Sequence, residues 1–228
     1  MLSVPLMAWC FPGRTSIGMV LPLLIMGDCF AVFWYKRHAL WDKIWGLIPW
    51  VVVGMAAGSG LLVVLGQEKG HKDRLDFLIG GLVLGMLCVH LIRLRIGDRL
   101  KLSSPLGMFA TGSLAGFATT VSNAAGPVMN LYMSSMKLEK EQFIGTTAWY
   151  YFIFNLIKLP IYLALTLNNP TNPILSINTA WFALAMFPAI LLGAFSGKRL
   201  LPHIPQTYFD RIVLILTAVF AVKLLLGG

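Results

Sequence analysis

The chain has 228 residues, of which 57% are apolar and 12% charged, with a formal net charge of +9. A soluble domain carries about 25% charged residues, so the composition excludes an ordinary soluble protein. The basic residues lie in short connections between apolar runs and form no single patch, which argues against nucleic-acid binding. We therefore expect an all-α, polytopic membrane protein.

Seven apolar segments follow one another along the chain, most of them near the roughly 20 residues that a membrane-spanning helix needs. They cover residues 17–35, 44–66, 75–93, 105–133, 143–166, 177–197 and 209–227. Trp34, Trp41 and Trp149 lie near segment ends, as is typical of membrane–water interfaces. The three cysteines have no CxxC spacing, and we expect no disulfide framework, metal site or cofactor.

Two stretches share the same spacing of proline, glycine and leucine at a constant separation of 139 residues. They are Pro49, Gly54, Gly58, Leu61 and Leu62, and Pro188, Gly193, Gly197, Leu200 and Leu201. A second matched set, separated by 127 residues, is Gly18 with Gly145 and Asp28 with Asn155. We interpret the chain as two related repeats, 1–104 and 105–228, with a transport site between them. The glycine pairs themselves mostly indicate close helix packing.

The segment at 105–133 has no counterpart in the first repeat. If the repeats are equal units, the first repeat lacks its initial helix, and about seven of eight helices are present. The sequence Val4-Pro5-Leu6-Met7 resembles Gly126-Pro127-Val128-Met129 and would then be the end of the missing helix.

The sequence Asn123-Ala124-Ala125-Gly126-Pro127 predicts a broken helix near 122–127. Proline suits the first turn of the second half-helix, and the amides of Val128 and Met129 would point into the break. Such an exposed helix start binds anions, and broken helices carry the substrate in secondary transporters. The candidate substrate-binding residues here are Thr119, Thr120, Ser122, Asn123, Gly126, Pro127 and Asn130. The alternative is a packing kink, in which small residues let helices approach closely.

Two charges, Asp28 and Lys158, fall well inside apolar segments. A charge near a helix centre costs about 2.5–3.5 kcal/mol on insertion scales, so each needs a partner or a role. Asn155 and Lys158 are three residues apart and share a helix face. In one interpretation Lys158 and Asn155 bind an anion and Asp28 couples or gates transport. In the other, Asp28 and Lys158 form a structural ion pair.

Four stretches of the chain resemble the sulfite exporter TauE/SafE family of membrane transporters. They are GMVLPLLIMGDCFAVFWYKRHALW, PWVVVGMAAGSGLL, TGSLAGFATTVSNAAGPVMNLYM and FIGTTAWYYFIFNLIKLPIY. The resemblance implies a multi-pass protein of a prokaryotic plasma membrane that transports small anions such as sulfite or organosulfur compounds. Members of this family usually begin with a helix that ends in a glycine triplet before a Val-Pro pair. Here Val4-Pro5 is present, whereas the helix and the triplet are not.

The function we expect is export of a small anion through a site between the repeats, driven by the proton gradient. The expected partners are the lipid bilayer and the anion, with no nucleic acid and with a homo-oligomer left open. A non-transporting membrane scaffold is the alternative. An enzyme is not expected, because the serine-protease candidates Ser122 and His90 lack a GxSxG-like context. An aspartyl type would need two membrane aspartates, and of Gly27-Asp28 and Gly97-Asp98 the second lies in a charged loop.

Overall fold

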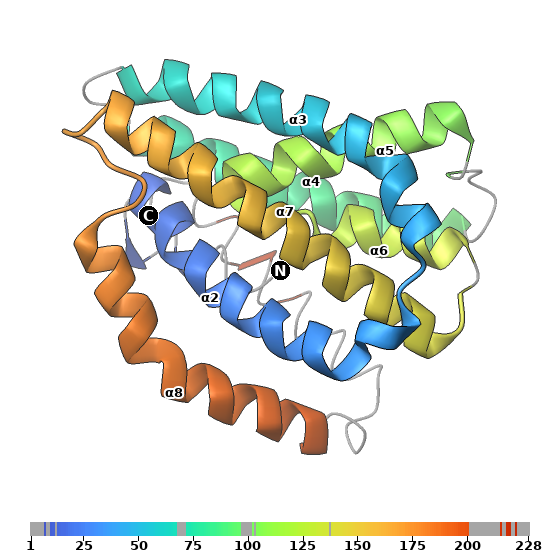
Figure 1. Ribbon diagram of the computed structural model, residues 1–228. Coiled ribbons are helices and arrows are strands. Elements are labelled where there is room, and N and C mark those ends of the chain that lie inside the picture. The colour runs from blue at the N-terminus through green and yellow to red at the C-terminus, as the bar shows by residue number, and fades with distance from the viewer. Residues whose placement is uncertain are drawn as a thin grey trace.

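The apolar segments are helices in the structure, a computed structural model (Figure 1). It describes residues 7, 10, 11, 13–67, 72–96, 102, 104–136, 138–200, 215, 218, 219 and 222. The helices are α2 (Gly13–Tyr35), η1 (Lys36–His38), α3 (Trp41–Gln67), α4 (Lys72–Ile96), α5 (Pro105–Ser122), α6 (Gly126–Ser135), α7 (Lys140–Asn168) and α8 (Ile177–Leu200). The described residues contain no strand, so the all-α prediction is confirmed.

Each predicted segment from 17–35 to 177–197 corresponds to a helix, or, for 105–133, to the two helices α5 and α6. The predicted segment 209–227, apart from four single positions, and the stretch Val4–Met7, apart from Met7, lie outside the described residues. Three of the described helices are long and apolar enough to cross a membrane, at Arg14–Tyr35, Trp41–Leu65 and Glu141–Asn168. In α8 the apolar stretch is shorter, Ile177–Gly193.

The outer surface of α3 is apolar, as a helix facing lipid requires. Val52, Val53, Val63 and Val64 are all exposed on this helix. A soluble protein would bury such a row of large apolar side chains, whereas hydrocarbon solvates them. This surface and the spanning lengths together identify a membrane protein.

Helices α3 and α5 pack in parallel with their backbones in contact. A Cβ at Gly54 would lie 2.0 Å from the Ser113 carbonyl oxygen, and one at Gly116 would lie 2.1 Å from the Val51 carbonyl oxygen. One turn further along both helices, Gly58 lies against Thr120. The predicted packing role of Gly54 and Gly58 is therefore confirmed, because a larger side chain would force the helices apart. The matched Gly193 of α8 has nothing within 4 Å.

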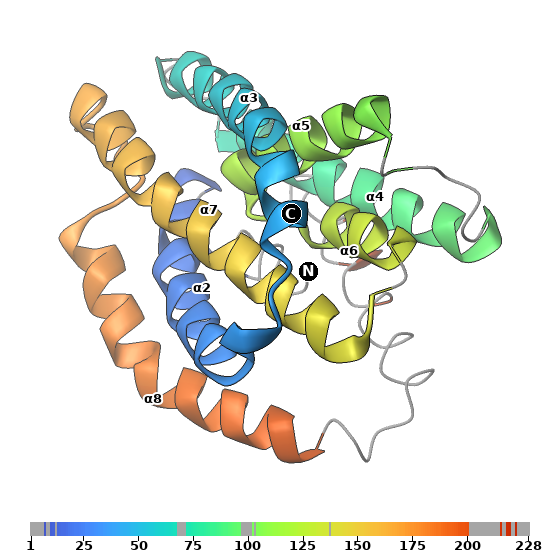
Figure 2. The same ribbon diagram turned by 45° about the vertical axis from the view of Figure 1, so that its right-hand side comes forward.

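Helices α2 and α7 pack antiparallel, and α8 lies along the outer side of α2 (Figures 1 and 2). The contacts between α2 and α7 are reciprocal at two glycines. A Cβ at Gly18 of α2 would lie 1.7 Å from the Ile174 carbonyl oxygen, just after α7. A Cβ at Gly145 of α7 would lie 2.7 Å from the Tyr35 carbonyl oxygen, at the end of α2. Each glycine therefore lets the chain that follows the partner helix approach closely.

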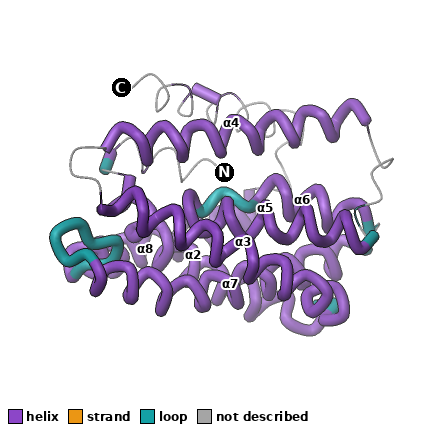
Figure 3. The backbone as a smooth tube through the Cα atoms, turned by 90° about the horizontal axis from the view of Figure 1, so that it is seen from above, coloured by secondary structure: helices purple, strands orange, loops and turns teal. Residues whose placement is uncertain are grey.

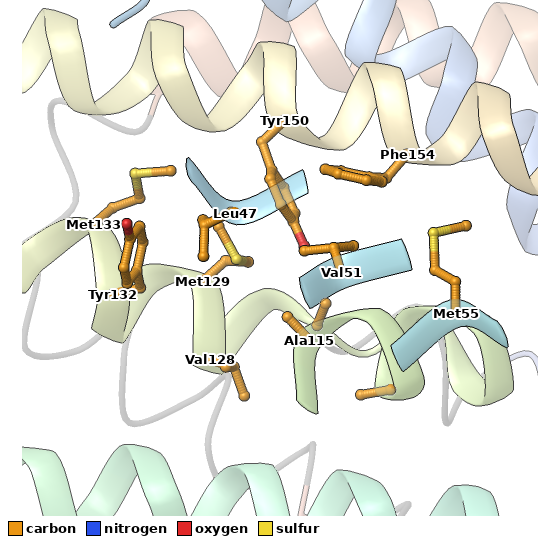
Figure 4. Packing of buried hydrophobic residues seen from close by; sticks show 12 residues of the cluster. Leu47, Val51, Met55, Ala115, Val128, Met129, Tyr132, Met133, Tyr150 and Phe154 are labelled. Atoms are coloured by element: carbon orange, nitrogen blue, oxygen red, sulfur yellow. The ribbon is translucent and has the colours of Figure 1, made fainter. Parts of the chain in front are cut away.

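Helix α4 forms a separate layer beside the other helices (Figure 3). Apolar side chains from α3, α5, α6 and α7 make one buried cluster (Figure 4). In it, the rings of Tyr150 and Phe154 of α7 pack at a tilt of 52° with their centroids 4.7 Å apart, and Tyr150 points toward Val51 of α3. This cluster holds α7 against α3 and α5, and it thereby determines which part of α5 lies beside Lys158.

Candidate functional site

The long fourth segment is broken between α5 and α6, at residues 123–125. Asn123 has φ 54° and ψ 23°, the left-handed conformation in which helices commonly end and which asparagine tolerates better than most residues. Its backbone N–H donates to the Thr119 carbonyl at 3.0 Å, and the N–H of Ala124 donates to the Ala118 carbonyl at 3.3 Å. The break is therefore a defined helix end, with Pro127 in the first turn of the next helix.

The first turn of α6 differs in one detail from the prediction. The amide of Met129 points toward the break but donates to the Ala125 carbonyl at 3.0 Å, so it is already paired and is not free to bind a ligand. The reason is that α6 begins at Gly126, one residue before Pro127. Proline has no N–H, so Gly126 and Val128 supply the amides of this first turn.

Lys158 of α7 is fully buried, and its ammonium group lies at the end of α5. Nζ donates to the Thr119 carbonyl at 3.3 Å, to Thr119 Oγ1 at 3.0 Å and to Asn123 Oδ1 at 2.5 Å. An ammonium group has three N–H bonds, so each has an acceptor. The carboxyl end of a helix carries partial negative charge, which further stabilises a cation there. We call Thr119, Asn123 and Lys158 the break cluster.

Asn123 connects three helices through its side chain. Its Oδ1 accepts from Lys158 of α7, while its Nδ2 donates to the Ile17 carbonyl of α2 at 3.1 Å. Since Asn123 itself ends α5, this one side chain bridges α2, α5 and α7. A change at the break is therefore transmitted directly to both α2 and α7.

Asp28 and Asn155, the matched positions of the two repeats, contact one another across the α2–α7 interface. Asn155 Nδ2 donates to Asp28 Oδ2 at 2.6 Å, with Asn155 buried and Asp28 partly buried. Lys158 follows Asn155 by one turn on the same helix face. In the described part of the chain, Asp28 and Lys158 make no direct ion pair within 4 Å. The polar contact that joins α2 to α7 is thus the Asp28–Asn155 hydrogen bond.

The other predicted site residues divide into two groups. The hydroxyls of Thr120 and Ser122 donate to carbonyls of their own helix, at Gly116 (2.9 Å) and Ala118 (2.9 Å). Buried Pro127 and partly buried Gly126 line the break, whereas Asn130 is exposed on α6 and lies apart from the break cluster. The structure thus brings Thr119, Asn123, Asn155, Lys158 and Asp28 into one connected polar region.

Two polar residues near the break were missed by the sequence reasoning. The hydroxyl of Tyr162 donates to the Thr120 carbonyl at 2.7 Å, and its position four residues after Lys158 placed it on the same face. Arg14, at the start of α2, is buried, and its Nη1 donates to the Leu62 carbonyl of α3 at 2.8 Å. The signal for Arg14 was a basic residue directly before an apolar run, which is also typical of an ordinary interfacial anchor.

Residues 1–224 match the family model described as Sulfite exporter TauE/SafE. No curated protein and no solved structure matches the chain. The family match spans α2 through α8 and the break between α5 and α6, so it includes every residue of the polar region. The chain belongs to the sulfite exporter TauE/SafE family of membrane transporters.

Proposed function

We propose that this protein is a multi-pass secondary transporter of a prokaryotic plasma membrane that exports sulfite or a related organosulfur anion. The anion binds at the break between α5 and α6, in the break cluster, with Asn155 beside it. The observation that carries this proposal is the buried ammonium group of Lys158 at a helix break, 3.0 Å from Thr119 Oγ1 and hydrogen-bonded to Asn123 Oδ1. Family membership makes a small anion the natural cargo.

The break cluster lets an anion bind while Lys158 keeps an acceptor for each of its N–H bonds. All three acceptors of Lys158 are oxygen atoms of the protein. An oxygen of sulfite can replace Asn123 Oδ1 as acceptor, so Lys158 keeps three hydrogen bonds throughout the exchange.

Asp28 is the coupling or gating group in this proposal. The Asp28 carboxylate opposes anion binding at Lys158 in two ways. It offsets part of the positive charge that attracts the anion, and it repels the anion itself, because like charges repel strongly in a medium of low dielectric constant. Protonation of Asp28 removes both effects and favours anion binding. The Asn155 side chain donates to Asp28 and lies three residues before Lys158 on α7, so it transmits the change from one to the other.

The repeat interpretation supports the position of the site. Gly18 of α2 contacts the chain just after α7, and Gly145 of α7 contacts the end of α2. Between these two contacts, Asp28 of α2 meets Asn155 of α7. A pseudo-twofold axis that exchanges α2 and α7 would pass between these two side chains. Transporters built from inverted repeats place their substrate near such an axis.

The test is sulfite efflux from proteoliposomes that contain the full chain. Lys158→Ala is expected to abolish efflux, since nothing else in the break cluster is positively charged. Lys43→Ala is the matched control, because Lys43 pairs with Asp42 at the start of α3 and is expected to leave efflux unchanged. Thr119→Val keeps the charge and removes one oxygen acceptor, which leaves Lys158 an N–H bond free for the anion, so it should lower the KM for sulfite.

Folding of each variant is checked by its elution as a single species and by its helical circular dichroism. A folded Lys158→Ala protein with normal efflux would refute the site. A wild-type protein that folds but moves no sulfite or organosulfur anion would favour the membrane scaffold instead.

A further inference from the structure

Arg14 is the second buried cation of the described chain. Arg14 and Lys158 are the charged residues among the buried ones, and Arg14 exposes only 5% of its surface. A guanidinium group in a spanning helix is costly and normally pairs with a carboxylate or lines a functional site. Within the described residues Arg14 has no carboxylate partner.

The hydrogen bonds of Arg14 leave part of its guanidinium group unused. Nη1 donates to the Leu62 carbonyl, while the Nε–H group is buried and has no acceptor. An unpaired N–H in a buried place destabilises the fold, more so when the group is charged. The edge of an arginine that includes Nε offers parallel N–H groups, which match two oxygens of one oxyanion. The unpaired Nε thus points to a ligand with at least two oxygen atoms.

The position of Arg14 places this unpaired group beside the break. Ile17, which follows Arg14 by three residues on α2, accepts the hydrogen bond from Asn123. Leu62 of α3, whose carbonyl accepts from Arg14, shares one buried cluster with Ile17 and Ala124. Arg14 therefore lies about one helical turn along α2 from the break cluster.

The charges of this region are unequal in number. Arg14 and Lys158 are buried cations, and Asp28 is a partly buried carboxylate. Asp28 lies fourteen residues from Arg14 on α2, about 21 Å along the helix, so it does not neutralise Arg14, whereas a bound anion would. The unpaired donor is at Arg14, because Lys158 already has oxygen acceptors for all its N–H bonds.

We propose that Arg14 is an anion-binding residue that holds sulfur oxyanions, sulfite or a sulfonate, by two oxygens at a subsite beside the break. This inference rests on the proposed function and deepens it, since it assigns the selection for oxyanions over spherical anions to Arg14. The anion exchanges between Arg14 and Lys158, and the two cations bind it from opposite sides of Asn123. Halide ions have one centre and gain nothing from the paired N–H groups.

The experiment compares Arg14→Lys with the wild-type chain in proteoliposomes, using sulfite, methanesulfonate and chloride as probes. Lysine keeps the positive charge and loses the paired donors. We expect the KM for sulfite and for methanesulfonate to rise about tenfold, which corresponds to the loss of one charge-assisted hydrogen bond. Any chloride flux should be unchanged, so the preference for oxyanions over chloride falls by the same factor. Arg37→Lys, at an exposed arginine of η1, is the control.

The outcomes separate this inference from the proposed function. Wild-type efflux with an unchanged sulfite KM and unchanged selectivity in Arg14→Lys overturns the role of Arg14 and leaves the transporter standing. Should the wild-type protein move no anion, binding of radiolabelled sulfite to the purified full chain decides. Weaker binding by Arg14→Lys than by wild type supports the subsite, and equal or absent binding overturns it. Arg14→Gln gives the same comparison without the charge and is expected to lose more affinity than Arg14→Lys.

Discussion

Lys158 and Arg14 are both buried cations, yet their surroundings differ. Lys158 has an oxygen acceptor for each of its three N–H bonds, all of them at the end of α5. Arg14 has the Leu62 carbonyl on α3, and its Nε–H has no partner. In the proposed transporter, a fully paired cation such as Lys158 has to exchange one partner when an anion binds. A cation with a spare donor, such as Arg14, can bind an anion without this exchange, so we expect the two residues to act in successive steps.

The largest expected effect is from a change that disturbs both cations together. In Gly116→Val the new Cβ would lie 2.1 Å from the Val51 carbonyl oxygen, so α5 must move away from α3. The acceptors of Lys158 are on α5 and the acceptor of Arg14 is on α3, so both environments change. We expect a loss of about 3 kcal/mol in stability, typical of strong overpacking, together with loss of transport.

Thermal unfolding in detergent, followed by circular dichroism, measures this loss. Gly193→Val is the control, because Gly193 is also a glycine within an apolar helix but has nothing within 4 Å. If both variants lost stability equally, close packing of α3 on α5 would not explain the effect.

A smaller effect is expected from Asn123→Ala, which acts on the Lys158 side only. The substitution removes the Oδ1 acceptor and the bond to the Ile17 carbonyl, and it places alanine at φ 54°. We expect a loss of about 2 kcal/mol from these terms. Asn123→Gly separates them, since glycine adopts a positive φ freely and still lacks the side chain. Equal unfolding temperatures for the two variants would show that the backbone conformation contributes nothing.

Asn123 also tests whether the two cations act independently. Its substitution removes the acceptor that the anion replaces at Lys158, so it should strengthen anion binding there and leave the selectivity that we assign to Arg14 unchanged. The preference for sulfite over chloride in Asn123→Gly measures this. A preference that falls as much as in Arg14→Lys would mean that one site, not two, selects the anion.

The smallest effect on stability is expected from Asp28→Asn. An asparagine oxygen at this position can still accept from Asn155, so the α2–α7 contact is kept. The charge is lost, and with it the competition between carboxylate and anion. Sulfite efflux measured across a pH series should therefore lose the part of its pH dependence that is due to Asp28. A variant with the wild-type pH profile would exclude Asp28 as the coupling group.

Much of the architecture could be predicted from the sequence because it depends on local signals. Apolar length gave the helices, and Asn123 with Pro127 marked the break, since asparagine tolerates a positive φ and proline suits a first helical turn. The matched spacing paired Asp28 with Asn155, and the structure has these two side chains in contact at 2.6 Å.

Side-chain choices could not be predicted in the same way. Thr120 and Ser122 sit at the break, but their hydroxyls donate to carbonyls one turn back, a local option open to any helical serine or threonine. The repeated spacing of glycines did not predict equal surroundings either. Gly54 touches the backbone of α5 and Gly193 has open space, because packing depends on the neighbouring helix and not on the pattern itself.

The contact between α3 and α5 also restricts how this protein can move. Where backbones touch at Gly54, Gly58 and Gly116, neither helix can slide past the other without driving its carbonyls into the opposite chain. We therefore expect the two helices to move as one rigid body. In the proposed transporter, the motion that admits an anion from one side and releases it on the other is then expected where α5 meets α7 and α2. Lys158 and Asn123 bridge these two boundaries, so we expect the hydrogen bonds at the break to set how often the protein opens.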